Sequence, residues 1–95
     1  MRYVYILLCA DNKLYIGYTE DLKKRIYLHK QGFVKATCPR LPVNLIFYEA
    51  YLNKYDALRR EKYFKTTKGK TTIKTMLKEY FNQTTSLSAK LQNQP

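Results

Sequence analysis

The chain has 95 residues, of which 18 are Lys or Arg and 7 are Asp or Glu, so its formal net charge is +11. This length leaves room for one modest core and excludes a large multi-step enzyme, because such a chain buries only ~60% of its unfolded surface. Hydrophobic residues make up 45% of the sequence, too many for intrinsic disorder. No apolar run approaches the ~18 residues of a membrane span, so we expect a cytoplasmic protein without a membrane partner.

The N-terminal residues predict a β-hairpin. Residues 3–9 carry β-branched and aromatic side chains on both alternating faces, which is typical of a central strand covered on both sides. Asp11 and Asn12 separate this segment from a second predicted strand at residues 14–18, and both residue types suit a turn.

A helix over residues 20–31 and a loop are expected next. Thr19 supplies an N-cap, and the two acids that follow it favour the first turn of a helix. Gly32 is expected to end this helix, and residues 33–42 are predicted to form an irregular basic loop.

The second half of the chain predicts a strand and two helices. Residues 43–52 are rich in large apolar side chains without a breaker, and Asn53 then caps a helix over residues 54–66. Gly69 marks a link, after which apolar residues recur at helical spacing from residue 73 to residue 81.

This order of elements, ββαβαα, indicates an α+β fold in which helices cover a small, mostly antiparallel, three-stranded sheet. We expect one domain over residues 1–82. Residues 83–95 are polar and aperiodic, so they are predicted to form a disordered tail.

The inventory of reactive residues excludes several chemistries. Cys9 and Cys38 form no CxxC pair and the chain has one histidine, so neither a disulfide framework nor a zinc cluster is indicated. No GxGxxG or Walker-type loop is present.

Lysine and arginine gather in segments of the sequence, which fits a polyanionic partner such as nucleic acid. The predicted nucleic-acid contacts are Gly17, Tyr18, Lys23, Lys24, Arg40, Arg59, Arg60, Lys65, Lys68 and Lys70.

Glu61 lies on the stripe of its predicted helix that should face the sheet. A carboxylate there must be paired, protonated or bound to a cation, because an isolated buried charge is costly. A salt bridge to Arg59, Arg60 or a strand residue and a cation site both satisfy this condition. Arg25 and His29 are an i,i+4 pair, so their side chains point the same way.

An ordered set of motifs carries a resemblance to a known superfamily. The motifs are Tyr3-Val4-Tyr5, Tyr15-Ile16-Gly17, Leu22-Lys23-Lys24-Arg25 followed by His29, and Ala57-Leu58-Arg59-Arg60-Glu61-Lys62. Over residues 2–82 the chain resembles the GIY-YIG endonuclease superfamily, specifically small stand-alone bacterial proteins similar to the nuclease domain of the bacterial excinuclease. Tyr18 stands where excinuclease-type domains often carry a lysine.

The resemblance implies catalytic roles for Tyr5, Tyr15, Arg25, His29 and Glu61. Glu61 would hold Mg²⁺ or Mn²⁺, Arg25 would face the phosphate, and Tyr5 with His29 would accept the proton of the attacking water. The implied protein is a magnesium-dependent DNA endonuclease, structure-selective or weakly sequence-specific, of the kind used in DNA repair.

Other functions fit the same residues. A non-catalytic DNA- or RNA-binding module on this fold is the main alternative, and a basic scaffold for an acidic protein is a third. We expect DNA to be favoured over RNA. A weak or DNA-dependent dimer is also expected, since one small site cuts both strands only with two protomers or two visits.

A shared site for Tyr5 and Tyr15 constrains the hairpin loop. A two-residue loop would place the two tyrosines on opposite faces of the sheet. The sequence therefore predicts an odd-numbered loop or a bulge, with Asn12 in left-handed geometry.

Overall fold

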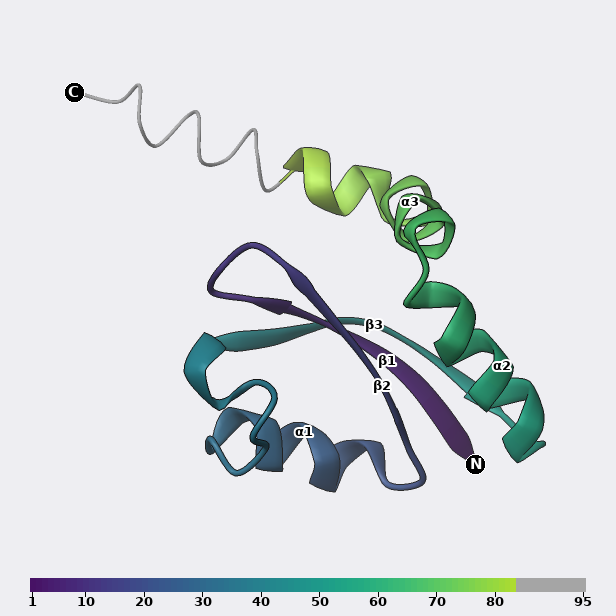
Figure 1. The fold of residues 1–95 in the computed structure, drawn as a ribbon, viewed down its shortest axis with the longest axis horizontal. Helices are drawn as coiled ribbons and strands as arrows, with labels where there is room; N and C mark the ends of the chain where they lie inside the picture. The colour runs from purple at the N-terminus through teal and green to yellow at the C-terminus, as the bar shows by residue number, and fades with distance from the viewer. Residues whose placement is uncertain (84–95) are drawn as a thin grey trace. The chain divides into compact units, whose positions relative to one another are not determined.

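The computed structural model describes residues 1–83 (Figure 1). The chain divides into two compact units, residues 1–63 and the residues from Phe64 onward. Of the predicted tail at 83–95, Gln83 is helical and the remainder lies outside the described residues. None of the described helices has the length and apolar character needed to cross a membrane.

A three-stranded antiparallel sheet forms the first unit, as predicted. β1 (Arg2–Cys9) is the central strand, between β2 (Leu14–Thr19) and β3 (Val43–Tyr51). Val4, Tyr5, Ile6 and Leu7 are all 0% exposed. Because successive side chains point to opposite faces, β1 is buried on both sides.

The loop of the β1–β2 hairpin consists of residues 10–12. The Cys9 amide donates to the Lys13 carbonyl, and the Asn12 amide donates to the Cys9 carbonyl, both at 3.0 Å. Asn12 has φ 63°. The odd-numbered loop and the left-handed asparagine are therefore confirmed.

This loop sets the register that the candidate site requires. Tyr5 pairs with Gly17 and Leu7 pairs with Tyr15. Since cross-strand partners share a face, Tyr5 and Tyr15 lie on the same face of the sheet.

Helices α1 (Leu22–Lys30) and α2 (Lys54–Phe64) lie on opposite sides of the sheet (Figure 1). Leu22 and Ile26 of α1 pack against the cluster that contains Tyr5. Glu49 pairs with Val4 in the register, on the other face, and accepts a hydrogen bond from Arg60 of α2 at 2.8 Å.

Both ends of α1 follow from local chemistry. Asp21 is its N-cap and accepts the Lys24 amide at 3.1 Å, so the predicted start at residue 20 with Thr19 as cap was wrong. The Thr19 hydroxyl instead accepts the Asp21 amide at 3.1 Å, in the turn before the helix. Gly32 follows the helix with φ 83°, as expected of a stop residue.

The loop after α1 contains a short 3₁₀ helix, η1 (Cys38–Arg40), and is tied to the hairpin. Arg40 donates from Nε to Asp11 at 2.9 Å, and its carbonyl accepts the Ala10 amide at 3.0 Å. The tip of the hairpin therefore holds the end of this loop.

The second unit contains α3 (Thr67–Met76), followed by helical residues 78–83. The Thr66 side chain caps α3 by accepting the Gly69 amide at 2.9 Å. Gly69 thus lies inside the helix, and the predicted link there was wrong. The cap at Thr66 also explains why α2 ends at Phe64 rather than at residue 66. Ile73 is fully buried, as its periodicity predicted.

Replacement of Asn12 tests the hairpin geometry. Asn12→Ala should lower the free energy of unfolding by about 1 kcal/mol. Left-handed backbone geometry is unfavourable for alanine, which has no polar side chain to form a local hydrogen bond. Asn12→Gly should match or exceed the parent, since glycine adopts this backbone freely. Lys13→Ala, at an exposed neighbour, is the control. Equal stabilities of the alanine and glycine variants in urea titrations would contradict the loop geometry.

Candidate active site

Side chains from β1 and α1 meet in a buried hydrogen-bonded cluster. The Tyr5 hydroxyl lies 2.7 Å from His29 Nε2 and accepts a hydrogen bond from Arg25 Nε at 3.3 Å. The second ring nitrogen of His29, Nδ1, lies 2.7 Å from Thr37 Oγ1. Tyr5, His29 and Thr37 are all 0% exposed. The structure therefore brings three of the predicted catalytic residues together and adds Thr37 to them.

Gly17 makes this cluster possible. A Cβ atom at Gly17 would lie 2.7 Å from Tyr5 Cε1 and closer still to the hydroxyl end of the ring. The Tyr5 ring therefore crosses β2 over the one residue type that leaves it room. Gly17 is buried under this ring, and its contact with nucleic acid stays a prediction.

Tyr15 joins the cluster from β2 through its ring. Its ring centroid lies 5.1 Å from that of His29 and 6.3 Å from that of Tyr5. Tyr15 and Arg25 are partly exposed, whereas Tyr5 and His29 have no exposed surface. The site thus has an inner layer of Tyr5 and His29, and an outer layer of Arg25 and Tyr15.

Burial keeps both inner residues neutral. Desolvation, with a smaller contribution from the Arg25 charge, lowers the pKa of His29 to about 4. Desolvation also raises the pKa of Tyr5 to about 12, although the hydrogen bond from Arg25 opposes it. The same hydrogen bond is the main cause that raises the pKa of Arg25, which stays a cation.

The role that the resemblance implied for Tyr5 with His29 stays a prediction. Both side chains are 0% exposed in this structure, and burial raises the pKa of Tyr5 to about 12. The Tyr5 hydroxyl is hydrogen-bonded to both His29 and Arg25. Tyr15 is the tyrosine of this cluster with surface open to a substrate.

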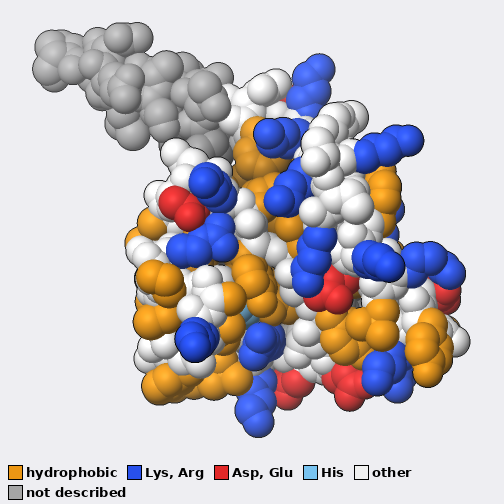
Figure 2. All heavy atoms as spheres, in the orientation of Figure 1, with side chains coloured by type: hydrophobic (Ala, Val, Ile, Leu, Met, Phe, Trp, Pro, Cys, Tyr) orange, Lys and Arg blue, Asp and Glu red, His pale blue; other side chains and the backbone are white. Residues whose placement is uncertain are grey.

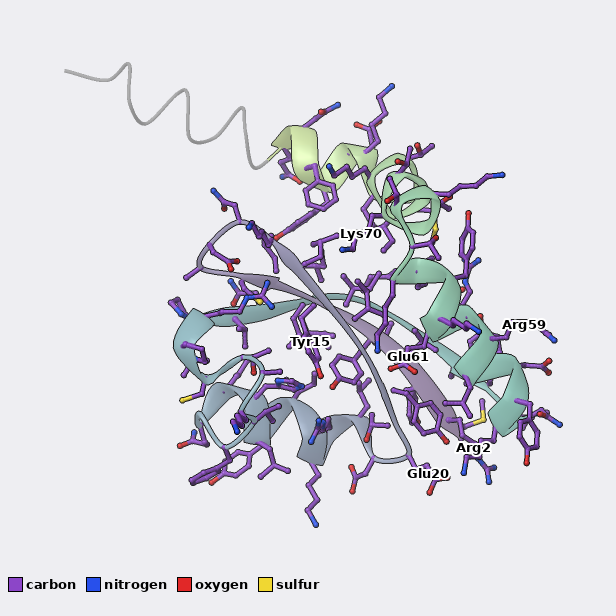
Figure 3. All side chains as sticks on the ribbon, viewed as in Figure 1. Arg2, Tyr15, Glu20, Arg59, Glu61 and Lys70 are labelled. Carbon is purple, nitrogen blue, oxygen red and sulfur yellow. The ribbon has the colours of Figure 1, made fainter. Side chains whose placement is uncertain are left out.

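Glu61 comes from α2. Its side chain points toward the sheet, whereas Arg59 points away from it, and in this view Tyr15 is drawn on the opposite side of the β2 ribbon (Figure 3). Glu61 is half-buried.

The other acids of residues 1–63 have structural roles. Asp21 caps α1 and Glu20 lies 3.6 Å from Arg2. The remaining ion pairs are Arg40 with Asp11 at 2.9 Å, Arg59 with Asp56 at 2.7 Å and Arg60 with Glu49 at 2.8 Å. The two arginines suggested as salt-bridge partners of Glu61 thus also bind other carboxylates.

The donor set fits a magnesium ion held by one carboxylate. Within residues 1–83, no group of three or more His, Cys, Asp or Glu side chains is placed to hold a metal. Mg²⁺ retains several waters and commonly takes one or two carboxylates plus substrate phosphate oxygens. Glu61, half-buried and directed toward the sheet, meets that requirement.

The basic residues divide into structural arginines and exposed cations. Arg40 and Arg60 are only partly exposed and are held by Asp11 and Glu49, and their contacts with nucleic acid stay predictions. Tyr18 donates its hydroxyl to Glu20 at 3.3 Å. Lys23, Lys24, Arg59, Lys65, Lys68 and Lys70 are exposed. Basic side chains are spread over the face drawn in Figure 2.

Sequence reasoning missed two features. Thr37 lies in an aperiodic loop, so no pattern connects it to His29. Lys74 is exposed one turn after Lys70 on α3. The spacing of four residues could have predicted that the two lysines lie on the same face of the helix. Residues 65–78 carry five lysines and no acid.

The hairpin-first α+β fold, with paired tyrosines on the sheet and an arginine from the next helix, is that of a small nuclease-type domain. The chain belongs to the GIY-YIG catalytic domain family, which matches residues 1–76. A UPF0213 protein from Lacticaseibacillus paracasei is 47% identical over 64 residues, covering 66% of this chain and 72% of the relative.

Two further similarities cover more of the chain. A UPF0213 protein from Streptococcus agalactiae serotype V is 42% identical over 82 residues, covering 85% of this chain and 92% of the relative. The solution NMR structure of a UPF0213 protein from Bacillus halodurans is 36% identical and has a TM-score of 0.53, covering 80% of this chain and 85% of that one.

The low pKa of His29 predicts a pH-dependent loss of stability. Between pH ~6.5, where an unfolded histidine titrates, and about 4, the unfolded chain binds a proton that the folded protein does not. Neutral, buried His29 therefore contributes to the free energy of unfolding at neutral pH. This contribution is lost on acidification, by up to about 3 kcal/mol. In urea titrations at pH 7 and pH 4.5, parent protein should lose more stability than His29→Gln. Parallel losses would contradict the assignment.

Proposed function

We propose that this protein is a magnesium-dependent endonuclease that hydrolyses phosphodiester bonds in DNA. The observation that carries the proposal is an arginine held at the surface by a buried tyrosine and histidine. Arg25 is fixed through Nε by the Tyr5 hydroxyl and also interacts with the partly exposed Tyr15. Family membership supports the same reaction class.

Arg25 has the geometry of a phosphate ligand. Its Nε–H is used by Tyr5, and the two Nη nitrogens belong to a guanidinium that is partly exposed. A planar guanidinium with a fixed orientation binds two phosphate oxygens at little cost in side-chain entropy. Such a preorganised cation stabilises charge that develops on the phosphate during hydrolysis.

Tyr15 and Glu61 complete the proposed site. The Tyr15 hydroxyl orients the attacking water by hydrogen bonding, since it is the accessible tyrosine of the cluster. Glu61 would hold the cation, and Arg25 would bind the phosphate. When bound, Mg²⁺ polarises a phosphate oxygen and offsets its negative charge.

Exposed lysines supply the remaining affinity for the strand. Lys23 and Lys24 lie on α1, which also carries Arg25. The second unit adds Lys65, Lys68, Lys70 and Lys74, which can neutralise backbone phosphates. Contacts between lysines and backbone phosphates do not read base edges, which is consistent with structure-selective or weakly specific cleavage of DNA. When both strands are cut, a dimer would form on DNA.

Glu61→Gln tests the enzyme assignment. With Mg²⁺, the purified parent should cleave labelled linear, branched or single-stranded DNA, and Glu61→Gln should lose at least about 10²-fold in rate. DNA affinity should stay equal or rise, because a negative charge near the phosphate is removed. Glu79→Gln, at an exposed carboxylate of the second unit, is the matched control and should behave as the parent.

Stability measurements separate this loss from misfolding. Breaking a buried ion pair would cost about 3–5 kcal/mol in unfolding free energy, whereas loss of a metal ligand should leave the fold intact. A Glu61→Gln variant that cuts at the parent's rate would overturn the mechanism. A parent that binds DNA but never cuts it would leave the non-catalytic binding module as the function.

A further inference from the structure

We propose that Thr37 is a positioning residue, which sets the hydrogen-bonding state of His29 and through it the orientation of Arg25. The connection runs from Thr37 Oγ1 to His29 Nδ1 at 2.7 Å, from His29 Nε2 to Tyr5 at 2.7 Å, and from Tyr5 to Arg25 Nε at 3.3 Å. This inference deepens the proposed function, on which its cleavage test rests.

The donors and acceptors of the cluster assign a direction to each hydrogen bond. Arg25 is a cation and can only donate, so the Tyr5 oxygen accepts from it. The Tyr5 hydroxyl also interacts with Tyr15, but its contact with His29 Nε2, at 2.7 Å, is a short buried hydrogen bond, and we assign the Tyr5 proton to it. In this assignment neutral His29 carries its hydrogen on Nδ1 and donates it to Thr37 Oγ1.

Thr37 is held in place by the loop that contains it. Its amide donates to the Val34 carbonyl at 3.1 Å, and its own carbonyl accepts the Arg40 amide at 2.8 Å. Arg40 in turn binds Asp11 and donates to the Leu14 carbonyl at 3.4 Å. The hairpin therefore fixes the loop, and the loop fixes the acceptor that His29 meets.

Removal of the Thr37 hydroxyl would disrupt this series of hydrogen bonds, starting at His29. Without an acceptor, the Nδ1–H of His29 would be unsatisfied in a site that excludes water, so the Nε2–H tautomer would be favoured. That hydrogen would face the Tyr5 proton, so the Tyr5 hydroxyl hydrogen would have to rotate away from His29. The Tyr5 oxygen would stay in place, but its hydrogen would turn toward the side of Arg25, and the hydrogen bond that orients the Arg25 Nε would weaken.

Imidazole ¹⁵N chemical shifts report the tautomer directly. His29 is the one histidine of the chain, so after removal of any purification tag its two ring nitrogens are assigned without ambiguity. At pH 7 the parent should show a protonated Nδ1 and an unprotonated Nε2. A parent with the hydrogen on Nε2 would overturn the proposal, and this measurement needs no variant.

Two substitutions at Thr37 test the consequence. Thr37→Val keeps the side-chain shape without the hydroxyl, whereas Thr37→Ser keeps the hydroxyl. Thr37→Val should move the tautomer toward Nε2–H and lower the rate of DNA cleavage by about 10²-fold with KM nearly unchanged. Thr37→Ser should restore both readouts. A folded Thr37→Val that keeps the parent's tautomer, or its rate, would overturn the proposal.

The two readouts also separate this inference from the proposed function. If the parent does not cleave nucleic acid, the endonuclease proposal fails. The tautomer of Thr37→Val then decides alone whether Thr37 orders His29.

Discussion

The hydroxyl of Tyr5 is the point on which the site depends. It lies in the interior, between the imidazole of His29 and the guanidinium of Arg25, and its ring reaches that place only because Gly17 has no side chain. One phenol thus couples the register of the hairpin to the first helix. A basic residue that would otherwise be a mobile surface cation becomes an oriented one, and oriented charge is what phosphodiester hydrolysis requires.

The basic side chains of the molecule fall into two groups, those that stabilise the fold and those that are exposed. Arg40 and Arg60 are paired with carboxylates and stabilise a loop and a helix, whereas the exposed lysines of α1 and α3 are placed to meet a polyanion. Lysine is a hydrated point charge suited to loose contacts with phosphate, and arginine forms planar, directional pairs. The net charge of +11 therefore does not measure how many basic side chains are free of carboxylate partners and available to nucleic acid.

Much of the fold was predictable because local signals agreed with the tertiary structure. The alternating pattern of β1, the turn residues Asp11 and Asn12, and the spacing of Tyr5 and Tyr15 gave the sheet and its register. Helix ends were less accurate, since Asp21 and Thr66 compete with equally good neighbouring caps. Thr37 was not predictable, because an irregular loop brings it to His29. Burial, which raises the pKa of Tyr5, is likewise a property of the folded chain.

The most direct test of this account is single-turnover cleavage of DNA by Tyr5→Phe, which removes one oxygen and keeps the ring over Gly17. Tyr3→Phe, two residues earlier on the same face of β1, is the matched control. The account predicts that Tyr5→Phe loses about 10²- to 10³-fold in the rate of the chemical step, with DNA affinity nearly unchanged, while Tyr3→Phe cuts as the parent does. A Tyr5→Phe protein that cleaves at the parent's rate would show that Arg25 needs no buried anchor and would contradict the central claim.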